Sequence, residues 1–263
     1  MELPRSSSLV ARLVVVPEAG STNTELVRAV AEDPSAWPAP AVLVTDHQTA
    51  GRGRLGRSWT AAAGDSLAIS VLLRPEVPSE RLGWVSLAAG AAMTQALRGL
   101  GVAAAAKWPN DVLIDGRKVC GVLAEALPAP SAGAGSGVGV VVGAGLNHAT
   151  PREALAVPTA TSLAIEGGPT DPDLLVAAYL ERLIALVGAF AAAGGDPEAS
   201  GLRAAVLGVS DTIGRQVRVS LPDGAVVGQA VDIDDAGRIV VDRGRGAGST
   251  ACATGDVEHL RYE

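Results

Sequence analysis

The sequence is poor in cysteine, histidine and aromatic residues, and each shortage argues against a class of protein. Its two cysteines, Cys120 and Cys252, are too few for a disulfide framework and lie among small or apolar residues. The three histidines are dispersed, without the spacing of a structural zinc site. Aromatic residues make up 3% of the chain, so Ala, Val and Leu must fill the core.

The chain also lacks a recognisable signal peptide and an excess of positive charge. The region around Glu2 and Arg5 has no apolar core, and residues 183–193, the most apolar helical stretch, are too few to span a bilayer. We therefore expect a cytoplasmic protein with no membrane partner. The formal net charge of −7 argues against wholesale binding of DNA or RNA.

What the chain does have is a dense run of arginine and glycine. Residues 51–59 read Gly-Arg-Gly-Arg-Leu-Gly-Arg-Ser-Trp. Glycine lets the backbone approach a ligand closely, and the guanidinium group matches phosphate and carboxylate oxygens. In an acidic chain, Arg52, Arg54 and Arg57 predict a local anion site, and a solvated basic loop is the alternative.

A second segment follows about fifty residues later. Residues 107–111 read Lys-Trp-Pro-Asn-Asp, and the pair Asp115-Gly116 beyond them predicts a tight hairpin. Antiparallel pairing would return Lys118 towards the end that carries Asn110 and Asp111. A lysine, an amide and a carboxylate that converge in this way can bind a polarised substrate and a divalent ion. A surface hairpin with a weak ion pair is the alternative.

Hydrophobic periodicity predicts a chain of alternating strands and helices. Expected strands cover 13–16, 42–44, 67–73 and 140–146, and expected helices cover 22–31, 84–100 and 172–193. The first helix opens on a capping box, Thr22 to Glu25. The Gly-rich segment 128–139 predicts a hairpin tip. Short strands after residue 211 predict a small barrel, so we expect two domains, 1–209 and 210–263.

Taken together, five motifs in order resemble those of biotin protein ligases. They are Ser21-Thr22-Asn23, the stretch 47–50 that leads into loop 51–59, the pentapeptide 107–111, Lys118 with Gly121-Val122-Leu123, and 142–147, which ends in Asn147. Some members of this family carry an N-terminal DNA-binding domain. Only twenty residues precede Ser21 here, so the resemblance is to the type that acts as a ligase alone.

The resemblance implies an α+β fold, a mixed but largely antiparallel central sheet with helices of the class II synthetase-like kind, followed by a small SH3-like barrel. It also implies a two-step reaction. The carboxylate of biotin attacks the α-phosphate of ATP and gives biotinyl-5′-AMP. A lysine of a biotin carboxyl carrier protein domain, from an acyl-CoA or pyruvate carboxylase, then attacks this mixed anhydride.

The resemblance assigns roles to individual residues. Lys118, Arg54 and Asp111 are the expected catalytic residues. The expected biotin site is Ser21, Thr22, Asn23, Gln48, Gly51, Arg52, Gly53, Arg54, Lys118 and Gly121. The expected nucleotide site is Arg52, Arg54, Trp59, Asn110 and Asn147. Asn110 and Asp111 are candidate ligands of Mg²⁺, and Asp111 is also expected to orient or deprotonate the incoming amine. Trp59 stacks on the adenylate or packs in the core, and Arg57 binds ligand or points to solvent.

Three other functions remain to be compared with this one. A lipoate–protein ligase shares the fold and the adenylate chemistry. An octanoyl transferase would need a cysteine nucleophile, and Cys120 lies on an apolar strand face. A nucleic-acid-binding protein would use the arginines of loop 51–59, but no aromatic platform lies beside them. The pattern leaves the oligomeric state open, a monomer included.

Overall fold

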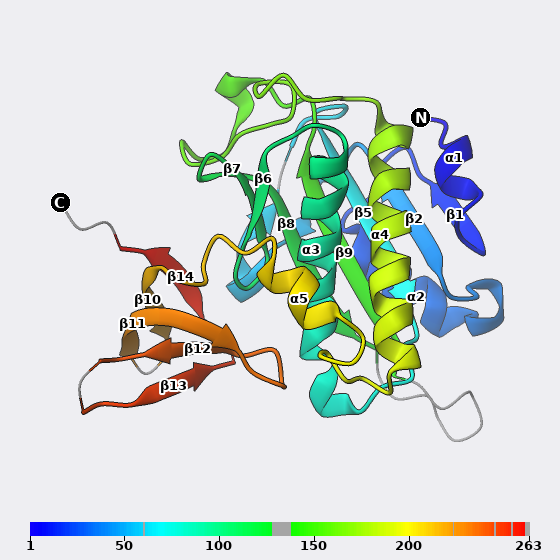
Figure 1. Ribbon diagram of the computed structural model, residues 1–263. Helices are drawn as coiled ribbons and strands as arrows, with labels where there is room; N and C mark the ends of the chain where they lie inside the picture. Colours follow the sequence, from blue (N-terminus) through cyan, green and yellow to red (C-terminus); the bar gives the residue numbers. More distant parts are fainter. Residues whose placement is uncertain (60, 128–137, 223, 245, 254, 261–263) are drawn as a thin grey trace.

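The computed structural model describes residues 1–59, 61–127, 138–222, 224–244, 246–253 and 255–260. Two sheets organise the chain, a larger one covered by helices and a smaller one beside it (Figure 1). The helices are α1 Pro4–Ser7, α2 Thr22–Glu32, α3 Gly83–Gly99, α4 Pro172–Ala192 and α5 Leu202–Leu207, with short 3₁₀ turns η1 Pro34–Ala36, η2 Arg54–Gly56, η3 Ser79–Arg81 and η4 Arg152–Ala154. The predicted hairpin tip, 128–139, lies mostly outside the described residues.

The larger sheet is mixed and mainly antiparallel. Its strand order is β1-β2-β5-β9-β8-β7-β6, and only the β1–β2 pair is parallel among its described strands. The strands are β1 Arg12–Val15, β2 Ala41–Thr45, β5 Ser66–Leu73, β6 Ala104–Lys107, β7 Asp111–Ile114, β8 Arg117–Ala126 and β9 Val140–Asn147. This arrangement confirms the predicted α+β class.

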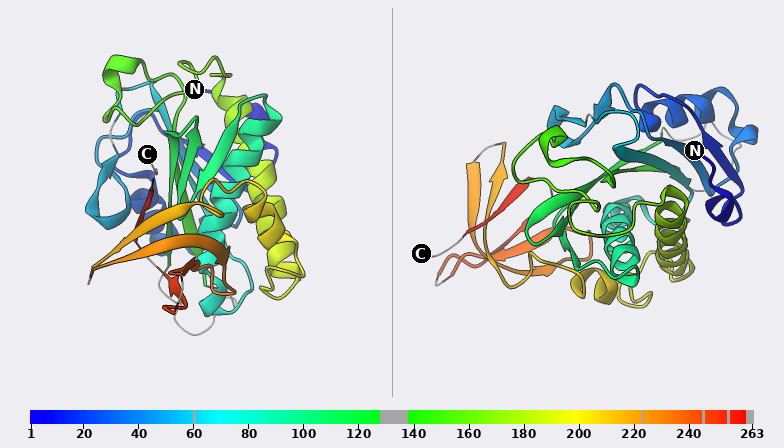
Figure 2. Two further views of the ribbon diagram at one scale, coloured as in Figure 1. Left: turned by 60° about the vertical axis from the view of Figure 1, so that its left-hand side comes forward. Right: turned by 90° about the horizontal axis from the view of Figure 1, so that it is seen from above.

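Helices cover both faces of this sheet. Apolar residues alternate along β5, a pattern typical of a strand with one solvent-exposed face, yet all eight of its residues are buried. Leu67 and Ile69 belong to the core beneath α3 and α4, whereas Leu72 belongs to a second core beneath α2. Figure 2 shows α3 and α4 on one side of the sheet and α2 on the other. The polar residues Ser66 and Ser70 are therefore inside the protein.

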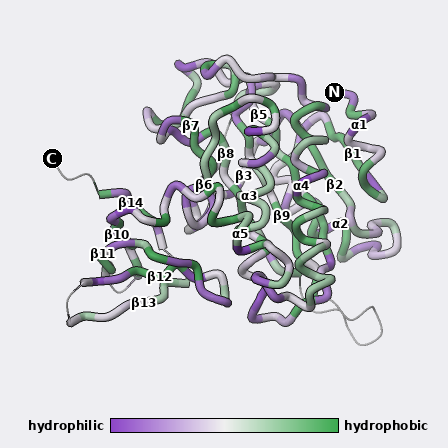
Figure 3. Tube along the Cα trace, viewed as in Figure 1, coloured by the Kyte–Doolittle hydropathy of each residue, from purple (hydrophilic) through white to green (hydrophobic). Residues whose placement is uncertain are grey.

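Helix α4 covers residues 172–192, as predicted to within one residue. It runs for 21 residues and is, by length and composition, the single described helix that could cross a membrane. The expectation that this region is too short was therefore wrong. About 44% of the apolar window is buried in the fold, with Tyr179, Leu183 and Phe190 inside the core. Its hydrophobic course beside α3 is visible in Figure 3, as expected for a helix that packs on a sheet.

Helix α2 begins at Thr22 as predicted, but its capping residue differs by one position. The N-cap is Ser21, not Thr22, and its hydroxyl accepts a hydrogen bond from the Thr24 N–H at 3.5 Å. Glu25 completes the cap by accepting from the Gly20 N–H at 2.7 Å. The one-residue shift frees the side chains of Thr22 and Asn23 from capping, and both are buried between α2 and the sheet.

The smaller sheet has five antiparallel strands in the order β13-β12-β11-β10-β14, which fits an SH3-like domain. Its strands are β10 Gln216–Leu221, β11 Gly224–Ile233, β12 Ile239–Asp242, β13 Ser249–Cys252 and β14 Asp256–His259; a short separate pair is formed by β3 Gly51–Arg52 and β4 Ser58–Trp59.

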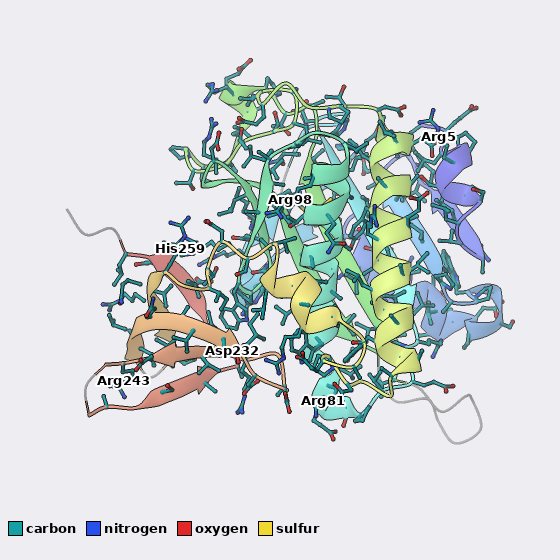
Figure 4. All side chains as sticks on the ribbon, viewed as in Figure 1. Arg5, Arg81, Arg98, Asp232, Arg243 and His259 are labelled. Atoms are coloured by element: carbon teal, nitrogen blue, oxygen red, sulfur yellow. The ribbon has the colours of Figure 1, made fainter. Side chains whose placement is uncertain are left out.

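Polar contacts attach the smaller sheet to the larger part of the fold. Arg203 of α5 lies over the Trp84 ring and pairs with Asp232 at 3.2 Å and Asp235 at 2.6 Å. Figure 4 shows Asp232 close to α5. The backbone N–H of Trp108 donates to the Thr212 hydroxyl at 3.0 Å. The 107–111 segment is therefore held against the start of the smaller sheet.

Candidate active site

A row of small residues crosses the middle of the larger sheet. The strand registers place Ala68, Gly145, Gly121 and Asp111 directly opposite one another on β5, β9, β8 and β7. Opposed residues share one face of a sheet, here the face that carries α2. Because the first three have at most one side-chain carbon, side chains from other segments can approach the sheet closely above them.

A β-bulge decides which face Lys118 occupies. Asp111 pairs with Gly121, but Leu113 pairs with Lys118, so β8 has one extra residue opposite β7. Lys118 is three residues from Gly121, so in a regular strand the two side chains would point to opposite faces. With the bulge, Lys118 shares the face of Gly121 and Asp111. The tight turn at Asp115 and Gly116, both with positive φ, was predicted from the sequence, whereas the bulge was not.

A cavity of about 310 Å³ opens above this row. It contains nearly all of the residues that the sequence nominated, from five separate segments. The lining residues are Ser21, Thr22, Asn23, Gln48, Arg52, Gly53, Arg54, Arg57, Ser58, Trp59, Ala68, 107–111, Lys118, 121–123, 143–145 and 256–258. The volume is in the range of small-molecule sites. The last three residues come from β14, so both sheets contribute to it.

Lys118 and Asp111 line the cavity as an ion pair. The Lys118 ammonium lies 2.6 Å from Asp111 Oδ1, with both side chains partly shielded from water. The same ammonium lies 5.6 Å from the centre of the Trp59 ring. A Cβ added to Gly145 would lie 2.5 Å from Trp59 Cε2. Trp59 therefore lies flat on the glycine row, with its indole N–H buried and unpartnered among the described residues.

Two arginines of the loop, Arg54 and Arg57, make polar contacts with other segments of the chain. Arg54 donates to Asn110 Oδ1 at 3.2 Å and to the Gly255 carbonyl at 3.5 Å. Burial lowers the pKa of Arg54, against the opposite effect of the Asp256 and Asp111 carboxylates. Arg57 forms an ion pair with Asp256 of β14. The loop therefore bridges the two sheets above the cavity, a contact that no sequence pattern around residue 256 indicated.

The residues nominated for the biotin head form a hydrogen-bonded group at one end of the cavity. Gln48 Oε1 accepts from the Thr22 N–H at 2.9 Å and lies 3.2 Å from its hydroxyl. Ser70, which is fully buried, bonds the Thr22 hydroxyl at 2.8 Å and Asn23 Oδ1 at 2.6 Å. Sequence reasoning missed Ser70, because a serine inside an apolar strand looks like an ordinary strand residue.

Two nominated residues do not line the cavity. Asn147 is buried, and its amide donates to the Thr161 carbonyl at 3.1 Å, so its contact with the nucleotide stays a prediction. Gly51 begins the loop and packs against Gln48. An added Cβ would be 2.1 Å from Gln48 Nε2 and 2.3 Å from the Trp59 carbonyl. The lack of a side chain at Gly51 allows the loop to pack on Gln48. The assignment of Gly51 to the biotin site stays a prediction.

Comparison with known proteins agrees with this geometry. Residues 18–147 match the biotin/lipoate A/B protein ligase family, and residues 212–259 match the biotin protein ligase C-terminal domain. The biotin–[acetyl-CoA-carboxylase] ligase of Mycobacterium tuberculosis is 40% identical over 95% of this chain and 90% of its own length. The chain belongs to the biotin protein ligase family.

Solved structures of the family have the same fold. The biotin protein ligase of Aquifex aeolicus in complex with biotin and ATP has a TM-score of 0.74 and 25% identity, over 96% of this chain and 100% of that one. The Leishmania major enzyme in complex with biotinyl-5-AMP has a TM-score of 0.61 and 23% identity, over 96% and 99%; at this identity it shows the fold alone. The predicted fold class and ligase activity are thus confirmed.

The environment of Cys120 does not suit the acyl-transfer chemistry of a cysteine nucleophile. Its side chain is fully buried, and burial raises the pKa of the thiol to about 12. A nucleophilic cysteine needs an exposed site that stabilises the thiolate. Cys120 is therefore a packing residue on the α3 side of β8, as its place in that core shows.

The donor set for a metal ion is small. No group of three or more His, Cys, Asp and Glu side chains gathers as a metal site in the described parts of the chain. Asn110 and Asp111 both line the cavity, and their oxygens already accept from Arg54 and Lys118. Mg²⁺ at nucleotide sites takes one or two protein oxygens together with phosphates and water. These two residues fit such an ion and do not fit an all-protein metal centre.

Proposed function

We propose that this chain activates biotin with ATP to biotinyl-5′-AMP and transfers the biotinyl group to a lysine of a biotin carboxyl carrier domain. One observation carries the proposal. Arg52, Arg54 and Lys118 line the same cavity as the neutral polar group around Asn23. A site for biotin needs hydrogen-bond donors and acceptors for the ureido ring at one end and cations for the carboxylate at the other.

In the first step, a carboxylate must approach a triphosphate against strong repulsion. We propose that Lys118 binds the biotin carboxylate and that Arg52 and Arg54 bind phosphate oxygens. The presence of Lys118 in the lining of the same cavity as Arg52 and Arg54 supports this role. The proposed contacts of the ureido ring are Ser21, Thr22, Asn23 and Gln48. Gly53 and Gly121 would leave room for the aliphatic chain of biotin.

The nucleotide and its ion would occupy the side of the cavity near β7. Trp59 is the proposed contact of the adenylate, with Asn110 and Asn147 as polar contacts. Asn110 and Asp111 would also hold Mg²⁺, which supplies neutralisation of phosphate charge when bound. Arg57, paired with Asp256, would hold the loop closed over the nucleotide.

In the second step, a lysine of the carrier attacks the mixed anhydride. Lys118 would stabilise the oxyanion that forms, and Asp111 would orient the incoming amine or accept its proton. We propose that the carrier is the biotin carboxyl carrier domain of an acyl-CoA or pyruvate carboxylase. The name of the M. tuberculosis relative, which refers to acetyl-CoA carboxylase, supports this choice.

We further propose that residues 1–209 form the catalytic domain and 210–263 a second domain that closes the cavity with β14. The enzyme would act in the cytoplasm, where ATP and carboxylases are available. Burial of α4 against α3 supports a core helix in place of a membrane span.

Pyrophosphate release with a panel of carboxylic acids tests the activity. Biotin with ATP and Mg²⁺ should give rapid release in the presence of a biotin carboxyl carrier domain, and lipoate or octanoate should give little. Biotin plus ATP should also raise the melting temperature, because both bind only the folded chain. Faster turnover with lipoate than with biotin would instead identify a lipoate–protein ligase, and stabilisation by oligonucleotides alone would identify a nucleic-acid-binding protein.

A further inference from the structure

We propose that Glu125 is a positioning residue for biotin, because its carboxylate ties loop 51–59 to helix α2 across one end of the cavity. The inference rests on the proposed function, since it concerns the biotin end of that site. Arg52 Nη2 donates to Glu125 Oε1 at 2.8 Å and to Oε2 at 3.0 Å. Asn23 Nδ2 donates to the same Oε2 at 2.8 Å. One carboxylate therefore joins three separate segments.

The position of Glu125 on its strand makes this contact possible. Gly121, Leu123 and Glu125 alternate along β8 and share the cavity face. Leu123 lines the cavity, so Glu125 lies one step beyond it. Its side chain is 29% exposed, against 49% for Arg52. A carboxylate that is partly withdrawn from water is stabilised by charge-assisted donors, and both of its donors line the cavity.

Glu125 also determines which way the Asn23 amide points. Asn23 Oδ1 accepts from the Ser70 hydroxyl at 2.6 Å, and Asn23 Nδ2 donates to Glu125 and, at 3.2 Å, to the Leu123 carbonyl. A flipped amide would bring its oxygen against two acceptors. The carboxylate therefore extends the polar group of Gln48, Thr22, Ser70 and Asn23 as far as the loop.

This network predicts an effect on biotin binding that is separate from chemistry. Without the charge of Glu125, the contact with Arg52 is no longer an ion pair, and a glutamine leaves a single acceptor oxygen for Arg52 and Asn23. Part of this order must then be restored when biotin binds. The cost should appear in KM for biotin. The described bonds of Lys118 and Arg54 go to Asp111, Asn110 and Gly255. Turnover at saturating biotin should therefore change little.

Glu125→Gln tests the proposal, because it keeps the shape and removes the charge. In pyrophosphate release at saturating ATP, KM for biotin should rise about tenfold, with kcat within about twofold of wild type. In the absence of ligands, trypsin should cleave after Arg52 several times faster in the variant. Glu32→Gln is the matched control. Glu32 lies on α2, where it forms an exposed ion pair with Arg28 at 3.6 Å, and neither residue lines the cavity.

A double-mutant cycle tests whether Arg52 and Glu125 act as a unit. The pair Arg52→Gln with Glu125→Gln should be no worse for biotin than the more damaging single variant. If the increases in biotin KM of the two single variants multiply in the double variant, the proposal is wrong. It is also wrong if the biotin KM and the cleavage rate of Glu125→Gln equal those of Glu32→Gln. A fall in kcat at unchanged biotin KM would overturn it too. If wild type itself releases no pyrophosphate with biotin, the proposed function fails, and the cleavage comparison still decides whether Glu125 holds the loop.

Discussion

Lys118 and Asp111 meet through their side chains although their backbones are not paired. The ammonium lies 2.6 Å from the carboxylate, while the backbone partner of Lys118 is Leu113 and that of Asp111 is Gly121. The ion pair thus reaches along the strands on the cavity face. A negative partner at this distance orients the lysine before substrate arrives, as a carboxylate-binding group requires.

Lys118→Ala should reduce kcat/KM for biotin by a hundredfold or more. Removal of the ammonium takes away about 2–4 kcal/mol of stabilisation from the transition state. The fold should persist, because the partly exposed Asp111 can be solvated. The measurement is pyrophosphate release with biotin and ATP, beside a thermal melt. Arg182→Ala, which removes an exposed positive charge from α4, is the control. Turnover equal to that of this control would remove Lys118 from the mechanism.

Loop 51–59 should be open to protease in the free enzyme and protected in the complex. The side chains of Arg52 and Arg57 are 49% and 67% exposed, and the glycines allow the backbone to move away from the sheet. Limited trypsin digestion with mass spectrometry should find cleavage after Arg52, Arg54 or Arg57. Biotin and ATP together should slow it. Equal rates with and without both ligands would contradict ordering of the loop by the adenylate.

Arg54→Gly should make the enzyme leak its intermediate. A charge-assisted bond to the phosphate contributes about 1.5–3 kcal/mol, so dissociation of biotinyl-AMP should quicken by roughly tenfold to a hundredfold. The released anhydride would label lysines of an unrelated lysine-rich protein, detected by a biotin probe. The chain itself has two lysines, Lys107 and Lys118, so labelling of the enzyme should be confined to these and the amino terminus. Persistent adenylate formation without extra bystander labelling would contradict retention by Arg54.

Gly145→Ala should displace Trp59 and weaken binding of biotin. The added Cβ would lie 2.5 Å from Trp59 Cε2 and 2.8 Å from Nε1, and a rigid ring cannot yield without moving away from the sheet. We expect a biotin KM at least about tenfold higher. Gly188→Ala in α4 meets nothing within 4 Å and is the control, with stability raised by about 0.5–1 kcal/mol. A biotin KM like that of the control would show that the row tolerates a methyl group.

Cys120 makes a pH-dependent contribution to stability with a definite sign. Burial raises the pKa of its thiol from 9.0 to about 12. Since the folded chain holds this proton more tightly, the contribution is fully present below pH 9 and is lost as the pH rises towards 12. Between pH 8 and pH 10, wild type should lose about 1.4 kcal/mol more than Cys120→Ala in urea unfolding. Equal losses in the two proteins would show that the thiol ionises freely in the folded state.

Local patterns in the sequence determined most of the elements and the members of the site. The alternation of β5, the Asp115-Gly116 turn and the glycine-framed arginines depend on residues close in sequence, so periodicity and turn chemistry predicted them. The same patterns placed the N-cap of α2 one residue late, because Ser21 and Thr22 are both good caps. They predicted the bounds of α4 within one residue, because Asp171 caps it and Pro172 begins its first turn.

The tertiary structure alone decided how the chosen residues face one another. The bulge in β8 turns Lys118 to the cavity face, and a bulge depends on strand pairing across the sheet. The tie from Arg52 to Glu125 joins residues that neither share an element nor follow a spacing rule. The bond from Arg57 to Asp256 depends on where the smaller sheet is attached. Side-chain type can be inferred from a local pattern, but its direction and partners follow from register and packing between distant segments.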